Sequence, residues 1–119
     1  MAVSPGYQAF VLDQLRRVLN GVRAKRMFGG VGLYSDELFF ALIDDDVLYL
    51  KVDDATRPDF EQRGLPPFQP FGEGSAPMQY YQLPEDLLED PEALRPWAEG
   101  AVAVARRAKR KKGGGRKQR

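Results

Sequence analysis

The sequence contains no cysteine and no histidine. Without cysteine the chain cannot form disulfides, thiolate nucleophiles, zinc ribbons or cysteine-bound iron–sulfur clusters. Without histidine it has no Ser-His-Asp or Cys-His catalysis, no histidine proton shuttle and no histidine metal ligand. An enzyme built from this sequence would depend on carboxylates, lysine, tyrosine or a bound cofactor. We therefore expect a protein that is not an enzyme and that needs no cofactor.

Long apolar runs are also absent. No stretch approaches the about 20 apolar residues that a membrane helix requires. The first ten residues, MAVSPGYQAF, lack the basic segment and apolar segment of a secretory signal. Together with the missing cysteines, these absences predict a cytoplasmic protein without membrane contact. At 119 residues the chain is long enough for one hydrophobic core.

Charge is distributed unevenly along the chain, although the net charge is only +1. The last 14 residues contain nine of the 18 basic residues and none of the 17 acidic ones, so residues 1–105 have a net charge of −8. We predict a folded domain at residues 1–108 and a disordered basic tail at residues 109–119, because the sequence GGG interrupts the end of the chain. The cations that we propose for nucleic-acid contact are Arg106, Arg107, Lys109, Arg110, Lys111, Lys112, Arg116, Lys117 and Arg119.

The most apolar and aromatic stretch is RMFGGVGLYSDELFFALIDDDVLYLKV, residues 26–52. Two short clusters of turn residues divide it into three runs rich in β-branched and aromatic residues, which is typical of antiparallel hairpins. We predict a three-stranded meander at Gly30–Tyr34, Leu38–Ile43 and Val47–Val52. The middle strand is apolar on both faces, so each face needs a cover from this chain or from a partner.

The rest of the chain predicts helices around this sheet. The expected class is α+β, with an N-terminal helix, an antiparallel β-sheet built as a meander, and C-terminal helices packed on the sheet. Between Leu65 and Pro77 the prolines and glycines forbid regular structure over most of the segment. The further predicted elements are helices at Pro5–Leu19, Arg57–Arg63 and Pro91–Ala108, and strands at Val22–Met27 and Met78–Leu83.

A glycine-rich run, FGGVG at residues 28–32, invites comparison with phosphate-binding loops. Such loops open a helix after the last glycine, whereas here a strand is expected to follow. We favour a turn or bulge where two strands meet.

Two acidic clusters invite a metal hypothesis, Asp44–Asp46 and Asp53–Asp54. An extended strand between them would separate the two clusters by roughly 20 Å, too far to share one ion. We therefore expect a solvated hairpin turn at the first cluster and no metal site.

Four segments in this order resemble the N-terminal domain of the TfoX/Sxy family: RMFGGVGLY, FFALIDDDVLYLKVD, a loop rich in proline and phenylalanine, and YYQLPEDLLEDPEALRPWAEGAVAVA. The resemblance covers roughly Phe10 to Ala108. It implies a bacterial regulator of competence (DNA transformation) genes with no established catalytic reaction. The best-known members have a second, helical C-terminal domain, which this sequence does not show. The resemblance implies a structural role in the sheet for the motif positions Arg26, Gly29, Gly30, Gly32, Tyr34, Tyr49 and Lys51.

Three functional hypotheses follow. The first is a small regulatory or interaction module, linked to transcription regulation in competence, whose basic tail contacts DNA without reading its sequence. The second is a protein-binding or self-associating module, such as a homodimer, with no DNA contact. The third is an enzyme that depends on Lys51, Arg26, Tyr34 and Tyr49. We favour the first.

Overall fold

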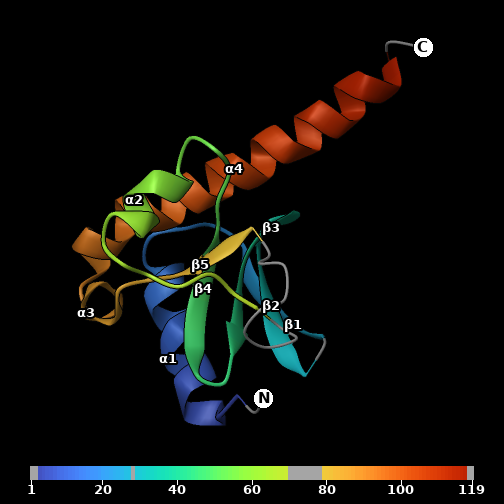
Figure 1. Cartoon of the computed structure of the whole chain (residues 1–119). Coiled ribbons are helices and arrows are strands. Elements are labelled where there is room, and N and C mark those ends of the chain that lie inside the picture. Colours follow the sequence, from blue (N-terminus) through green and yellow to red (C-terminus); the bar gives the residue numbers. More distant parts are fainter. Residues whose placement is uncertain (1–2, 28, 70–78, 118–119) are drawn as a thin grey trace.

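The computed structural model describes residues 3–27, 29–69 and 79–117, with residues 111–117 described by their backbone alone. Figure 1 shows an antiparallel sheet with a short N-terminal helix and a long C-terminal helix. Phe28, Met78, Arg119 and most of the predicted loop at Leu65–Pro77 lie outside the described residues. The elements are α1 (Pro5–Arg16), β1 (Val22–Met27), β2 (Gly30–Ser35), β3 (Leu38–Asp44), β4 (Val47–Lys51), α2 (Arg57–Glu61), β5 (Tyr80–Gln82), α3 (Glu85–Leu88) and α4 (Pro91–Lys117).

The sheet is a five-stranded meander in the order β1-β2-β3-β4-β5, and each strand pairs antiparallel with its neighbour in sequence. The predicted three-stranded meander is confirmed as its centre, and the α+β class is confirmed with it. Two residues, Asp45 and Asp46, connect β3 to β4, with φ angles of 53° and 56°. Positive φ at both central residues matches the tight hairpin turn whose twist fits the flanking strands. The turn predicted at the aspartate cluster is therefore confirmed.

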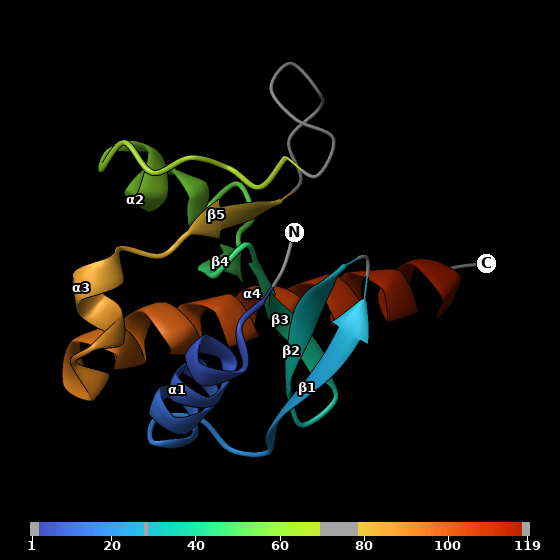
Figure 2. The same ribbon diagram turned by 90° about the horizontal axis from the view of Figure 1, so that it is seen from below.

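One face of the sheet forms the hydrophobic core. Val31, Leu33, Ala41, Ile43 and Leu50 are buried there by residues of α1 and α4. Both helices lie on this side of the sheet, and α1 approaches β1 whereas α4 crosses β3 and β4 (Figure 2). The expected cover for one apolar face of the middle strand thus comes from the chain itself.

A β-bulge shapes the middle strand. The register between β2 and β3 passes from Leu33↔Ala41 to Tyr34↔Phe39, so Phe40 has no direct partner on β2. Phe40 is fully buried in the core. An extra residue in one strand changes the direction of the following side chains, and here it places Phe39 on the opposite face of the sheet from the core.

The opposite face is organised by a row of stacked side chains. The Arg23 guanidinium lies 4.5 Å from the centre of the Tyr34 ring, and Tyr34 stacks on Phe39 at 5.2 Å. Phe39 contacts Tyr80 at 5.6 Å, and the Lys51 ammonium lies 5.0 Å from the Tyr80 ring centre. Cation–π and aromatic pairs across strands each add about 0.5–1 kcal/mol. The second apolar face is therefore filled by this cation–aromatic row, which connects all five strands.

Helix boundaries follow capping chemistry. The Ser4 hydroxyl accepts a hydrogen bond from the Tyr7 N–H at 3.3 Å and Pro5 begins α1, as predicted. The helix ends at Arg16, earlier than the expected Leu19, because the chain tightens into a turn before Gly21. In the same way α2 ends at Glu61 rather than at the expected Arg63, and the strand expected at Met78–Leu83 is reduced to β5.

The last helix is longer than predicted. Its expected end was Ala108, whereas α4 continues to Lys117 and includes Pro96 within its first turns. Alanine, arginine and lysine all favour helix, which explains the extension as far as Lys112. Gly113, Gly114 and Gly115 were expected to interrupt the end of the chain, yet they continue the helix against their own low helix propensity. Figure 1 shows the C-terminal part of α4 projecting beyond the sheet. The division of the chain into a domain and a tail at residue 108 stays a prediction.

Candidate nucleic-acid interface

The basic end of α4 is a helix rather than an irregular tail. Ala105 is the last buried residue of α4 among those whose side chains are described, and the next five residues are exposed. Four of them are cations, namely Arg106, Arg107, Lys109 and Arg110. Lys111, Lys112, Arg116 and Lys117 continue the same helix, and only their backbone is described; Arg119 lies outside the described residues. The structure thus brings eight of the nine predicted cations together on one helical segment.

One of these cations is bound by the body of the protein. Arg107 donates from Nε and Nη2 to Oδ2 of Asp53 at 3.0 Å and 2.6 Å. The other oxygen, Oδ1, accepts from the backbone N–H groups of Ala55 and Thr56, both at 3.1 Å. Desolvation by burial alone would raise the pKa of Asp53, but the hydrogen bonds from Arg107 and from these N–H groups outweigh it and lower the pKa. Asp53 is therefore a charged anchor between β4 and α4.

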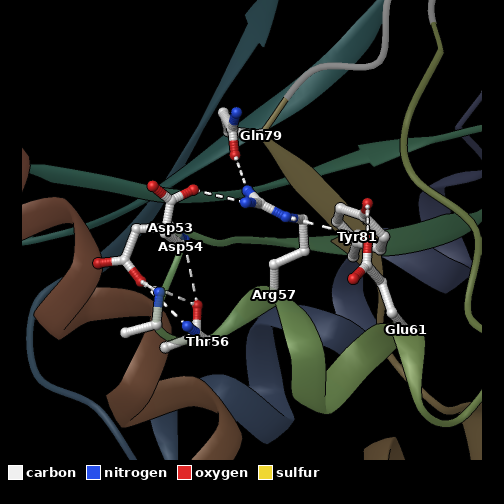
Figure 3. A network of polar contacts seen from close by, with 8 residues as sticks. Asp53, Asp54, Thr56, Arg57, Glu61, Gln79 and Tyr81 are labelled. Atoms are coloured by element: carbon white, nitrogen blue, oxygen red, sulfur yellow. Dashed lines mark hydrogen bonds and ion pairs between the residues drawn. The ribbon is translucent and has the colours of Figure 1, made fainter.

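A second polar network fixes α2 beside this anchor (Figure 3). Arg57 donates to Gln79 Oε1 at 3.1 Å and forms an ion pair with Asp54. The Tyr81 hydroxyl donates to Glu61 Oε2 at 3.0 Å. The pKa of Tyr81 is raised, first by desolvation and then by its hydrogen bond to Glu61. These contacts connect the end of β4, α2 and β5, so the loop that holds Asp53 is rigidly placed.

An open hollow lies where β3 begins and β4 ends, against α4. Lys51 and Lys109 line it together with the apolar side chains of Leu38 and Phe39. Glu37 contributes a carboxylate to the same hollow. Lys109 on α4 and Lys51 on β4 thus extend the positive surface of the helix onto the sheet.

The family-motif positions have mostly structural surroundings. Gly29 adopts a φ of +78° in the turn between β1 and β2, which glycine adopts without strain. Gly30 faces the Ile43 carbonyl of the neighbouring strand, and Gly32 lies beneath Met27 and Phe39. These contacts agree with the turn expected for the glycine run.

The proposed lysine–tyrosine cluster is only partly assembled. Tyr34 and Lys51 belong to the cation–aromatic row, and Lys51 lies 3.5 Å from the Tyr80 hydroxyl. Tyr49 instead contacts Phe68, with ring centres 5.0 Å apart, and its pKa is raised by desolvation and by Asp44. Arg26 pairs with Val31 at the exposed edge strand, outside this row.

Three residues have roles that the sequence did not predict. Asp53 anchors Arg107, Arg23 begins the cation–aromatic row, and Tyr80 joins Phe39 to Lys51 within it. Alternation along the predicted strand at Val22–Met27 could have placed Arg23 opposite Tyr34. In contrast, no sequence pattern joins Asp53 to a helix that begins 38 residues later.

Two kinds of site are not found in the part of the chain that the structure describes. Residues 3–27, 29–69 and 79–117 contain no group of three acidic side chains placed to bind a metal ion. Within the same ranges no helix combines the length and the apolarity needed to cross a membrane.

Comparison with known proteins identifies the family. Residues 13–105 match the family described as the TfoX N-terminal domain. A relative from Spirochaeta aurantia, described as an uncharacterized 12.7 kDa protein in the trpE 5′ region, is 44% identical over 61 residues. That match covers 51% of this chain, and the chain spans about half of the relative, 52% of its length. Since the family match covers most of the chain, this protein belongs to the TfoX N-terminal domain family.

Proposed function

We propose that this protein is a non-catalytic regulatory module that binds nucleic acid through the exposed basic end of α4. The observation that supports this proposal most directly is the geometry of the helix. Arg106, Lys109 and Arg110 are exposed on a helical segment that projects away from an acidic body (Figure 1). Residues 106–119 contain no acidic side chain, so this segment attracts a phosphate backbone even though Asp53 and Glu37 of the body lie close to its base.

The chemistry of this surface favours contact with phosphates over contact with bases. Arginine and lysine bind phosphate oxygens and release condensed counterions, and this gives an affinity that falls steeply with salt and does not depend on sequence. Such a module would deliver a regulator to DNA while another surface recruits a partner. Regulation of competence genes in the cytoplasm is the role that family membership supports.

Full-length variants test the proposal. Replacing Arg106, Lys109 and Arg110 together by glutamine should greatly weaken binding to a 20-bp duplex at low salt. The plot of log K against log[salt] should flatten by about one unit for each phosphate that the helix no longer neutralises. The matched control replaces three exposed cations of the body, Lys25, Arg63 and Arg95, and so removes the same charge. Equal weakening in both triple variants, or none in the first, would contradict a specific role for α4.

The alternative of a protein-binding or self-associating module stays a prediction. The outer strand β1 places Arg23, Lys25 and Arg26 on the surface, and charged side chains on an edge strand oppose pairing with a second sheet. The large apolar side chain most exposed among the described residues is Phe10, at 40%. Sedimentation velocity over a wide concentration range, repeated with Phe10→Ser, checks this alternative. A dimer that Phe10→Ser abolishes would support it.

A further inference from the structure

The cations of α4 are not equivalent, because Arg107 already has an anionic partner. Its guanidinium contacts one oxygen of Asp53 through two nitrogens, at 3.0 Å and 2.6 Å. A phosphate oxygen would occupy the same donors, since guanidinium binds carboxylate and phosphate with similar geometry. A phosphate that binds the Nε and Nη2 edge of Arg107 must therefore displace Asp53.

The two partners differ in how firmly they are held. Oδ1 of Asp53 is fixed by Ala55 and Thr56, and the Thr56 hydroxyl lies 3.3 Å from it. The Arg107 side chain is 49% exposed and extends from the surface of α4. Arg107 can swing toward solvent while the carboxylate stays in place, so the contact opens by movement of the arginine alone.

We propose that Asp53 is an internal competitor for phosphate, which occupies Arg107 and keeps the affinity of the basic helix for nucleic acid below its full value. This inference rests on the proposed function, because it assigns a role within the same surface. Arg106, Lys109 and Arg110 are exposed on the adjoining positions of the helix, so a phosphate backbone bound to them passes close to Arg107. The partner that fits exposed cations on successive turns of one helix is a phosphodiester backbone.

The test uses full-length Asp53→Asn and a fluorescent 20-bp duplex. Asparagine keeps an oxygen that accepts from Ala55 and Thr56, so the turn is preserved, but its amide does not hold Arg107. We expect binding roughly three- to tenfold tighter at 50 mM salt, and a salt dependence steeper by about 0.9, because Arg107 then neutralises one more phosphate.

Asp54→Asn is the matched control. It removes the same charge at the next residue, whose side chain contacts Arg57 instead of Arg107. Asp53→Asn should also have no effect on affinity in an Arg107→Gln background. Equal gains from Asp53→Asn and Asp54→Asn would show a general charge effect and overturn the inference. A gain that persists in the Arg107→Gln background would do the same.

One result separates this inference from the proposed function: if the wild-type chain binds the duplex and Asp53→Asn binds it no more tightly, the inference is overturned and the proposed function stands. If the wild-type chain does not bind the duplex but Asp53→Asn does, the competitor model is supported in its strongest form. If neither binds, both proposals are overturned. A gain in affinity for polyglutamate without a gain for the duplex would assign the surface to an acidic protein and overturn the phosphate assignment. Thermal unfolding by circular dichroism confirms that each variant is folded.

Discussion

At the scale of single residues, close approach between strands explains two glycines of the motif. A Cβ at Gly30 would lie 2.5 Å from the carbonyl oxygen of Ile43, which is part of the neighbouring backbone. At Gly32 a Cβ would meet the side-chain ends of Met27 and Phe39, 2.5 Å from Met27 Cε and 3.0 Å from Phe39 Cε1. A methionine terminus can move to another rotamer, whereas a strand carbonyl cannot move without disrupting its pairing.

We therefore expect Gly30→Ala to lower the free energy of unfolding by about 1–3 kcal/mol or more. Gly32→Ala should lower it by less, because Met27 can adjust. Urea unfolding of both variants measures the difference. A larger decrease for Gly32→Ala would show that the methionine and phenylalanine are more rigid than the backbone beside Gly30.

Residue types predicted some of these details and missed others. Alternation in LYLKV correctly places Tyr49 and Lys51 on one face of β4, because the period of a strand is two. The same rule fails in LFFALI, since the bulge at Phe40 shifts the following side chains by one position. A bulge depends on how two strands fit together, and neither strand encodes it alone. The anchor of Arg107 on Asp53 was missed for the same reason, because it joins residues 54 positions apart.

At the scale of elements, small side chains let α4 lie close to the sheet. Leu94, Ala98 and Ala101 are buried in the core on one stripe of α4, the helix that packs against β3 and β4. The alanines in AEGAVAVA, residues 98–105, favour a helix that packs closely on its neighbour. The C-terminal end of α4 could not be predicted in this way. Beyond Ala105, the described residues make no packing contact that would mark where the helix ends.

Larger side chains in this alanine stripe should push α4 away from the sheet. We expect Ala98→Leu to destabilise the protein by about 1–3 kcal/mol, since added methylene groups have no space in a filled core. Glu99→Leu, at the exposed neighbouring position, is the control and should change stability by less than about 0.5 kcal/mol. Thermal unfolding followed by circular dichroism compares the two. A neutral Ala98→Leu would mean that the interface contains unfilled space.

At the scale of the whole molecule, buried tyrosines link stability to alkaline pH. Desolvation by burial is the main cause that raises the pKa of both Tyr7 and Tyr80 to about 12, with Glu85 adding to the shift of Tyr7 and Tyr34 to that of Tyr80. In the unfolded chain both groups titrate near pH 10. Between about pH 10 and pH 12 the folded state holds protons that the unfolded state has released, so stability is complete below pH 10 and falls as the pH rises.

We expect the free energy of unfolding to fall between pH 10 and pH 12, by as much as about 1.4 kcal/mol per pH unit for Tyr80 and by less for the half-buried Tyr7, whose charge solvent screens. Tyr80→Phe should remove one part of this slope, and Tyr7→Phe another. Urea unfolding at pH 9, 10, 11 and 12 gives the slopes, and the values at pH 9 show the effect of each substitution without ionisation. A slope that is unchanged in both variants would assign the alkaline transition to other groups.

The order of elements along the chain has a consequence for synthesis on the ribosome. Strands β1 to β5 pair only with sequence neighbours, so the sheet can assemble as it emerges from the ribosome. The helix that covers β3 and β4 comes last, after every strand has been made. Because translation adds only about 5–20 residues per second, the apolar face of the nascent sheet stays exposed for seconds before α4 has been made. During that interval we expect ribosome-associated chaperones to bind the exposed apolar face of the incomplete chain.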